Sequence, residues 1–262
     1  MIGRLPPSPD RLVEAARLTG LAPADVRARL AGPLPRVLLT DPDPERARGL
    51  VAELEALQFA AFTCEPRSVP DDGERLLARR LELAFGRLRV VGGGASAGEH
   101  PARGEVGDHA GEDEELLPSA LVLIQKGVRA ATKTETTKTS ERRLDLGRAL
   151  LSGGLILTKK VDTTTTKTTS SRDAFVLLHR RDGGRDVMIY ERKIDYRFLG
   201  ADIQPSSAAN FDRLIAKLRA WAPNVPFDDR VTRPGFVSGL TAWSTAPVDL
   251  ALWLVELVHR RA

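Results

Sequence analysis

The amino-acid sequence predicts an α+β fold, in which a small N-terminal α/β module precedes an antiparallel β-rich domain with a closing C-terminal helix. Helix-start signals and short apolar runs alternate over residues 8–65, which is typical of a small α/β module. Segments rich in Thr, Val and Leu follow between Ser119 and Leu199, separated by turn signals that favour antiparallel strands. An amphipathic helix then begins at Ser206 and Ser207.

The N-terminal module carries the signals of three helices and two strands. Ser8 and Asp43 are suited to cap helices because each is followed by a proline, which fits the first helical position. Thr19-Gly20 ends the first helix, and Gly32 closes the second. The predicted helices cover residues 9–19, 23–30 and 44–57, and the predicted strands cover residues 36–39 and 59–64.

Within this module, residues 11–64 resemble the C-terminal domain of the ribosomal large-subunit stalk protein. The resemblance rests on the Thr19-Gly20-Leu21 turn, on prolines before the predicted strand, and on a capped helix followed by a closing β segment. It covers about a fifth of the chain. What it implies is a fold, and Clp-adaptor proteins that share this fold bind peptides or helices. The implied role is therefore protein binding.

The same resemblance does not extend to a ribosomal role. The stalk family contacts translation factors through basic residues on its helical hairpin. The corresponding positions here are Val13, Ala16 and Ala24, and only Arg27 is basic.

Residues 66–75 are predicted to form a linker, followed by a hairpin over residues 79–91 with its turn at Gly86. A short helix beginning near Asp72 is the alternative for the first half. The next segment, residues 92–116, is rich in Gly and acidic residues, and we expect a disordered loop. Its two histidines, His100 and His109, lack the spacing and the cysteines of a metal site.

The β-rich part contains several further strands. A buried strand is expected at residues 121–124, and two Thr-rich arms favour extended structure, with a short helix over residues 140–151 considered between them. Gly183-Gly184 marks the turn of a hairpin between residues 173–181 and 186–192. A short strand is predicted at residues 196–199, and Pro223 ends the helix that follows. This element order resembles the pleckstrin-homology and GRAM-like fold, and a small β-sandwich packed by the same helix is the alternative.

The last predicted element is a helix over residues 247–261 that is apolar on nearly all sides, as buried helices are. We expect it to dock on the neighbouring domain or to form a dimer interface, because it is short for a membrane span. The predicted division is an N-terminal module over residues 1–66, a β-rich domain over 73–226 containing the acidic loop 92–116, and a docking tail over 227–262.

Charge is divided unevenly along the 262 residues. Residues 1–116 contain 15 Lys and Arg against 20 Asp and Glu, whereas residues 117–262 contain 24 against 15. This asymmetry suggests an acidic partner for the second part, or attraction between the two parts themselves. A single cysteine, Cys64, excludes an intrachain disulfide, and the N-terminus shows no secretory signal, so we expect a cytoplasmic protein.

No pattern in the sequence indicates an enzyme, a cofactor or a metal site. We expect His179 at the exposed end of a strand and Cys64 as a buried small apolar residue. Glu191 and Asp195 lie beside Arg192 and Lys193, and surface ion pairing explains them. A nucleophile motif and a phosphate-binding glycine loop are both missing. The first functional prediction is therefore a non-enzymatic binding or adaptor protein whose partner is another protein.

The alternative prediction concerns the Lys- and Thr-rich ribbon at residues 131–171, which would bind phosphates of an anionic lipid surface or of nucleic acid. The arms contain no aromatic residue for base stacking, and they are too polar for a membrane pore. A structural ribbon, with lysines that prevent edge aggregation, is a third interpretation. The candidate anion-binding residues are Lys133, Lys138, Arg142, Arg143, Lys159, Lys160 and Lys167.

Overall fold

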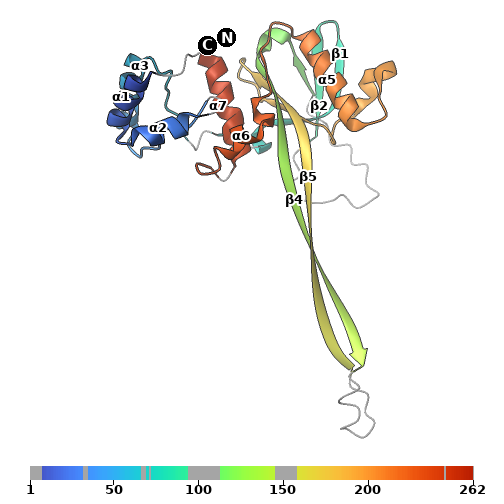
Figure 1. The fold of residues 1–262 in the computed structure, drawn as a ribbon. Helices are drawn as coiled ribbons and strands as arrows, with labels where there is room; N and C mark the ends of the chain where they lie inside the picture. The colour runs from blue at the N-terminus through green and yellow to red at the C-terminus, as the bar shows by residue number, and fades with distance from the viewer. Residues whose placement is uncertain are drawn as a thin grey trace, which may run out of the picture. The chain divides into compact units, whose positions relative to one another are not determined.

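In this computed structural model, the described residues are 8–31, 35–65, 69–70, 72–93, 113–144, 158–244 and 246–261. For residues 130–144 and 158–171 the description covers the backbone alone. The chain separates into two compact units, Met1–Val128 with Ala174–Ala262, and Arg129–Asp173. Helices accompany a seven-stranded sheet, which confirms the α+β class (Figure 1). The predicted domain boundaries near residues 66, 73 and 226 do not correspond to the boundaries of these two units, and they stay predictions.

The three N-terminal helices form where the sequence predicts them: α1 (Pro9–Thr19), α2 (Pro23–Leu30) and α3 (Pro44–Ala56). The Ser8 side chain accepts a hydrogen bond at the start of α1, and the Asp43 side chain accepts two at the start of α3. Gly20 ends α1 with a φ of 70°, which a glycine adopts without strain. Their buried residues form a separate apolar cluster of Leu12, Ala15, Ala16, Val26 and Leu54.

The two strands predicted in the N-terminal module, at residues 36–39 and 59–64, do not form. Neither segment pairs with a strand in the described part of the chain. Their alternating pattern has another cause, since Leu38 packs on the N-terminal cluster and Val37 on the cluster around the C-terminal helix. Phe59 and Phe62 are divided between the same two clusters. The alternation therefore reflects a segment between two apolar clusters, which mimics the period of a strand.

The sheet has the strand order β3-β2-β1-β6-β5-β4-β7 and is mixed rather than wholly antiparallel, which corrects the prediction. β1 pairs with β6 in parallel, as does β4 with β7, while the pairs β1–β2, β2–β3 and β5–β6 are antiparallel. Hairpin signals report only consecutive strands, so they could not show these two parallel pairs. The strands are β1 (Leu76–Ala84), β2 (Arg87–Gly92), β3 (Asp113–Leu116), β4 (Leu121–Leu144), β5 (Thr158–Arg180), β6 (Val187–Tyr190) and β7 (Phe227–Asp228).

The predicted hairpin at residues 79–91 is confirmed by β1 and β2. Its turn places Phe85 and Gly86 at positive φ, the conformation that suits a tight hairpin. The competing helix near Asp72 is only a three-residue 3₁₀ turn, Asp72–Glu74. The predicted acidic loop extends too far, because its last residues, Asp113–Leu116, form β3. Leu116 is buried, and Asp113 and Glu115 form ion pairs with arginines of β2. Residues 94–112 of that loop lie outside the described residues.

One helix covers each face of the central strands. Along β5, Val176 and Leu178 pack with α5 (Ser207–Trp221), whereas Phe175 and Leu177 pack with α7 (Pro247–Arg261). Successive side chains of a strand point to opposite faces, so one apolar strand serves both layers. Both helices, and the docking of α7 on the β-rich part, are as predicted. In the described residues, no helix combines the length and the apolar character needed to cross a membrane.

Two further predictions about local structure are wrong. Residues 196–199 belong to a 3₁₀ segment, Tyr196–Asp202, because the Asp195 side chain caps it and Gly200 turns the chain at positive φ. The helix considered for residues 140–151 is contradicted at Ser140–Leu144, which belong to β4, and residues 145–157 lie outside the described residues. The Thr-rich arms are strands, as expected.

Candidate functional site

The seven predicted anion-binding residues all lie on the two long strands. Lys133, Lys138, Arg142 and Arg143 belong to β4, and Lys159, Lys160 and Lys167 belong to β5. β4 and β5 are neighbours in the sheet, and these residues fall within the unit Arg129–Asp173. Their side chains lie outside the described residues. The fold therefore places the seven on one two-stranded ribbon, while their anion binding stays a prediction.

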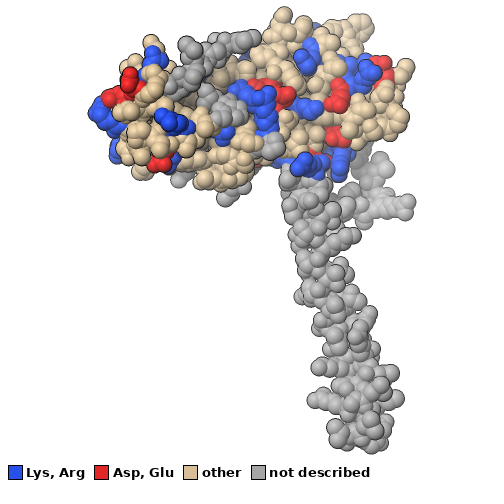
Figure 2. All heavy atoms as spheres, in the orientation of Figure 1, with Lys and Arg blue, Asp and Glu red and all other residues tan. Residues whose placement is uncertain are grey.

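This ribbon unit accounts for the positive charge of the protein. Residues 129–173 contain ten Lys and Arg against five Asp and Glu, and the rest of the chain has a net charge of −1. In the other unit, Figure 2 shows basic and acidic side chains interspersed over the visible described surface. The excess positive charge of the chain is therefore concentrated on a single two-stranded unit.

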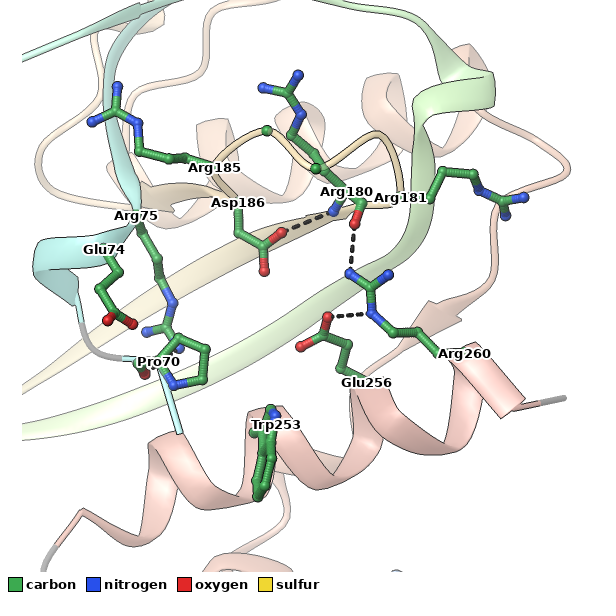
Figure 3. A pocket seen from close by; sticks show the side chains of 12 residues that line it. Pro70, Glu74, Arg75, Arg180, Arg181, Arg185, Asp186, Trp253, Glu256 and Arg260 are labelled. Atoms are coloured by element: carbon green, nitrogen blue, oxygen red, sulfur yellow. Dashed lines mark hydrogen bonds and ion pairs between the residues drawn. The ribbon is translucent and has the colours of Figure 1, made fainter. Parts of the chain in front are cut away.

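The other unit contains a pocket of about 340 Å³ between the Gly183-Gly184 turn and the last turns of α7 (Figure 3). Five arginines and three carboxylates contribute to its wall. The arginines are largely compensated, since Arg180 pairs with Asp182 and Glu114, and the guanidinium of Arg75 pairs with Asp72 and Asp249. The lining residues are Pro70, Glu74, Arg75, Arg180, Arg181, Gly183, Gly184, Arg185, Asp186, Trp253, Glu256 and Arg260.

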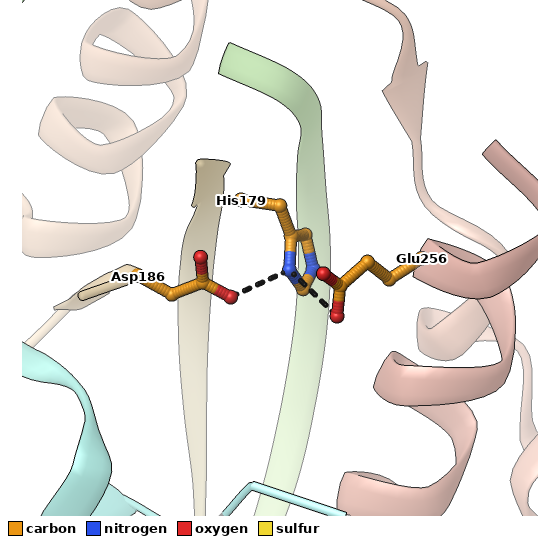
Figure 4. A group of neighbouring side chains, drawn as sticks. All are labelled: His179, Asp186 and Glu256. Atoms are coloured by element: carbon orange, nitrogen blue, oxygen red, sulfur yellow. Dashed lines mark hydrogen bonds and ion pairs between the residues drawn. The ribbon is translucent and has the colours of Figure 1, made fainter. Parts of the chain in front are cut away.

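At one wall of this pocket, His179, Asp186 and Glu256 converge from β5, from the residue before β6, and from α7 (Figure 4). The Nδ1 atom of His179 lies 2.8 Å from Asp186 Oδ2 and 3.3 Å from Glu256 Oε2. On its other side, Nε2 lies 2.8 Å from Oε1 of Gln125. His179 is 1% exposed, so its predicted place at an exposed strand end is wrong.

Burial and charge oppose each other in this cluster. Burial by itself lowers the pKa of His179, but the hydrogen bonds and negative charges of Asp186 and Glu256 outweigh it and raise the pKa above its ordinary value. For Glu256, burial by itself raises the pKa. The hydrogen bonds from His179 and Arg260 outweigh this effect and bring the pKa to about 2. The Glu256 carboxylate is therefore held in its charged form by His179 and Arg260.

The sequence analysis missed this cluster because its members are far apart in the chain, although His179, Glu256 and the neighbouring Gln125 each had a local signal. His179 continues the alternation of Phe175 and Leu177 on the face that α7 covers. Gln125 follows Leu123 in the same way on β4. Glu256 is an acidic residue at the end of the buried run Leu250–Glu256, and a buried charge requires a partner.

The remaining candidate residues do not join the pocket. The Asp195 carboxylate pairs with Arg197 rather than with Arg192 or Lys193, and the Glu191 carboxylate accepts a hydrogen bond from Ser207. Cys64 is exposed, so its expected burial is wrong, and the strand that would have buried it does not form. The three groups that could have suggested catalysis, His179, Glu191 and Asp195, are therefore not brought together by the described contacts.

No protein-family model, curated protein or solved structure matches this chain. The resemblances to the stalk-protein domain and to the pleckstrin-homology fold stay predictions.

Proposed function

We propose that this chain is a non-enzymatic, peripheral membrane-binding protein whose β4/β5 ribbon attaches to an anionic lipid surface. The observation that carries the proposal is the arrangement around the end of the ribbon. Arg142-Arg143 lie at the end of β4 and Lys159-Lys160 at the start of β5. Between these basic pairs, residues 144–157 contain seven Leu or Ile and no aromatic residue.

Basic and apolar residues act together at a lipid surface. Each Lys or Arg near an anionic leaflet contributes about 1 kcal/mol of attraction, and apolar side chains contribute by entering the boundary of the acyl chains. Arms of 16 residues, 129–144 and 158–173, span about 50 Å in extended form. The net charge of −1 on the rest of the chain leaves the ribbon as the source of attraction.

Lipid is favoured over nucleic acid by the composition of the same unit. Residues 129–173 contain no Phe, Trp or Tyr, so the ribbon has no side chain on which a base could stack. The seven Leu and Ile residues have no role in contacting a phosphate backbone, whereas between two basic pairs they suit a membrane interface.

Vesicle sedimentation tests the proposal. The full chain is mixed with phosphatidylcholine vesicles, with and without phosphatidylglycerol, over a range of salt concentrations. We expect binding only to the anionic vesicles, weakening as salt rises. A variant with Arg142, Arg143, Lys159 and Lys160 changed to Gln should bind at least about tenfold more weakly. The matched control removes four basic residues elsewhere: Arg46, Arg48, Lys193 and Lys217.

Three results would contradict the proposal. Equal binding to neutral vesicles would remove the role of charge, and equal weakening in the control variant would remove the role of the ribbon. The third result is that the wild type binds duplex DNA or RNA in a salt-sensitive way but does not bind vesicles. If the ribbon variant loses this binding, the ribbon is a nucleic-acid site.

The apolar contribution is measured separately. A variant with Leu155→Ser and Ile156→Ser keeps every charge of the ribbon. We expect it to bind anionic vesicles more weakly at every salt concentration, with the same dependence on salt as the wild type. An unchanged affinity would show that the apolar residues take no part.

The protein-binding role predicted for the N-terminal residues is a second proposal, supported by a groove of about 670 Å³ beside α1 and α3. Leu18, Leu21 and Leu50 line it together with Trp243, whose ring lies 5.3 Å from the Arg29 guanidinium. Apolar and aromatic walls beside charged residues suit a peptide or a helix. Quantitative comparison of proteins that copurify with the wild type and with Trp243→Ala tests this, and identical sets would contradict it.

A further inference from the structure

The cluster of His179, Asp186 and Glu256 has the organisation of a metal-binding site. Both carboxylates are turned to Nδ1 of His179, and this nitrogen and the two facing oxygens lie within 4.8 Å of one another (Figure 4). They come from β5, from the residue before β6 and from α7, so the position lies where the sheet meets the helix.

The second polar atom of each residue is held from outside the cluster. Nε2 of His179 faces Gln125 Oε1 at 2.8 Å, and Asp186 Oδ1 accepts the backbone N–H of Arg180 at 2.9 Å. Oε1 of Glu256 accepts a hydrogen bond from Arg260 Nε at 2.6 Å. In metal sites, such outer partners fix the orientation of the ligands and direct the remaining lone pairs at the ion.

The imidazole tautomer follows from its contact with Gln125. An amide oxygen only accepts hydrogen bonds, so Nε2 of His179 carries the proton and donates. In the neutral ring, Nδ1 then presents a lone pair to two carboxylate oxygens, at 2.8 and 3.3 Å. Three lone pairs at such distances call for a positive species between them, either a proton on Nδ1 or a metal ion. Gln125 is 0% exposed, so its contact with Nε2 lies inside the core.

We propose that His179 Nδ1, Asp186 Oδ2 and Glu256 Oε2 bind a divalent transition-metal ion of the Zn²⁺ type. Imidazole nitrogen with carboxylate oxygen is a ligand set that Zn²⁺ accepts at about 2.0–2.2 Å. Tetrahedral ligands at that range lie about 3.3 Å apart, which matches the distance from Nδ1 to Glu256 Oε2 and exceeds the 2.8 Å distance from Nδ1 to Asp186 Oδ2. Water from the adjoining pocket completes the coordination, because Asp186 and Glu256 also line that pocket.

The charge of the cluster favours a cation. The two carboxylates contribute −2, Arg260 on Glu256 contributes +1 and the neutral imidazole contributes nothing, so the set has a net charge of −1 before an ion binds. The nearby Arg180 is already paired with Asp182 and Glu114, and the guanidinium of Arg75 with Asp72 and Asp249, so their charges are compensated by other acids. Binding would join α7 to the sheet through Glu256, and the ion would therefore stabilise the folded state.

The test measures Zn²⁺ binding to the full chain after treatment with a chelator. All titrations use a background with His100 and His109 changed to Gln, since these lie in an acidic segment outside the described residues. We expect one Zn²⁺ per chain by competition with a chromophoric chelator, and a rise in melting temperature on adding Zn²⁺. Glu256→Gln and Asp186→Asn keep the side-chain shape and should each weaken binding at least about tenfold.

The matched control is His259→Gln. His259 also lies on α7 and also contacts a buried carboxylate, with Nε2 at 3.2 Å from Asp228 Oδ2, but it is outside the cluster. Its Zn²⁺ affinity should equal that of the background. Circular dichroism confirms that each variant is folded before titration. The proposal is overturned if the folded background protein binds no stoichiometric Zn²⁺, which would assign the position to a proton on Nδ1. It is equally overturned if Glu256→Gln and His259→Gln have the same affinity.

Discussion

Gly127 lies on β4 against the ring of Phe175, in contact so close that a Cβ atom at this position would overlap the ring. Phe175 of β5 is fully buried against α7, so the ring has little room to move. We expect Gly127→Ala to lower the free energy of unfolding by about 1–3 kcal/mol, the usual cost of overpacking. Urea denaturation at neutral pH measures the change.

The control is an alanine where the structure leaves space. Gly49 lies inside α3, and a Cβ atom added there would meet no neighbouring atom within 4 Å. Alanine is the better helix former, so Gly49→Ala should raise the free energy of unfolding by about 0.5–1 kcal/mol. Opposite signs for the two glycines are expected, and a loss of stability in both would refute the packing argument at Gly127.

Asp228 provides a prediction for stability against pH. This residue of β7 is mostly buried. It faces Arg230, two positions further along the chain, and His259, which belongs to α7. Burial by itself raises its pKa, but the hydrogen bonds from His259 and Arg230 hold the pKa well below its ordinary value. A lowered folded-state pKa means that the carboxylate stabilises the fold above the unfolded value of about 3.9, and that this contribution is lost as the pH falls below it.

We therefore expect Asp228→Asn to lose about 1–3 kcal/mol at neutral pH, because it leaves Arg230 with a weaker partner. The difference between wild type and variant should persist down to about pH 5 and shrink towards about pH 3, where the wild-type carboxylate begins to lose its advantage over the unfolded chain. Chemical denaturation over this range measures it, and a difference that grows with acidity would contradict the assignment.

At the level of residues, the sequence shows local roles well and distant partners poorly. The caps Ser8 and Asp43 act within a few residues of themselves, and both were predictable. The burial of His179 depends on Glu256, which follows it by 77 positions, and on Gln125, which precedes it by 54. Pairing over such distances is set by the packing of α7 on the sheet, which no local pattern contains.

Among the elements, the start of α5 offers a direct test of capping. The Ser206 side chain accepts a hydrogen bond from the Ala209 N–H at 3.2 Å. Ser206→Ala should therefore cost about 1 kcal/mol of stability. Ser207→Ala is the matched control, since this hydroxyl only donates to the exposed Glu191 carboxylate, and a change of less than about 0.5 kcal/mol is expected there. Equal losses in thermal or urea unfolding would show that Ser206 is not the cap.

Elements with strong periodicity were predicted, and those decided by tertiary contacts were not. α1, α3, α5 and α7 follow from caps and apolar faces, and the two hairpins follow from their glycine turns. The unpaired segments at residues 36–39 and 59–64 show the limit of this reasoning. Apolar alternation is necessary for a half-buried strand, but a chain between two apolar clusters produces the same alternation without a pairing partner.

For the whole molecule, the two units have different physical roles. The described core residues of all three apolar clusters lie outside Arg129–Asp173, whereas that unit carries a net charge of +5. Folding energy and positive charge are therefore separated along the chain. This separation was visible in part from the sequence, since the Thr- and Lys-rich arms contain little that a core could bury.

This separation predicts that the ribbon can be removed without unfolding the rest. In a variant that joins Arg129 to Asp173 through Asn-Gly, the two shortened strands are linked by a turn that suits the twist of a hairpin. No described core residue is lost, and a shorter connection costs less loop-closure entropy. We expect a melting temperature within about 5 °C of the wild type, together with loss of binding to anionic vesicles.

Differential scanning calorimetry and vesicle sedimentation measure the two properties on the same preparation. A variant that no longer unfolds cooperatively would show that the ribbon contributes to the core, whereas a stable variant that still binds the vesicles would place the lipid contact elsewhere on the chain.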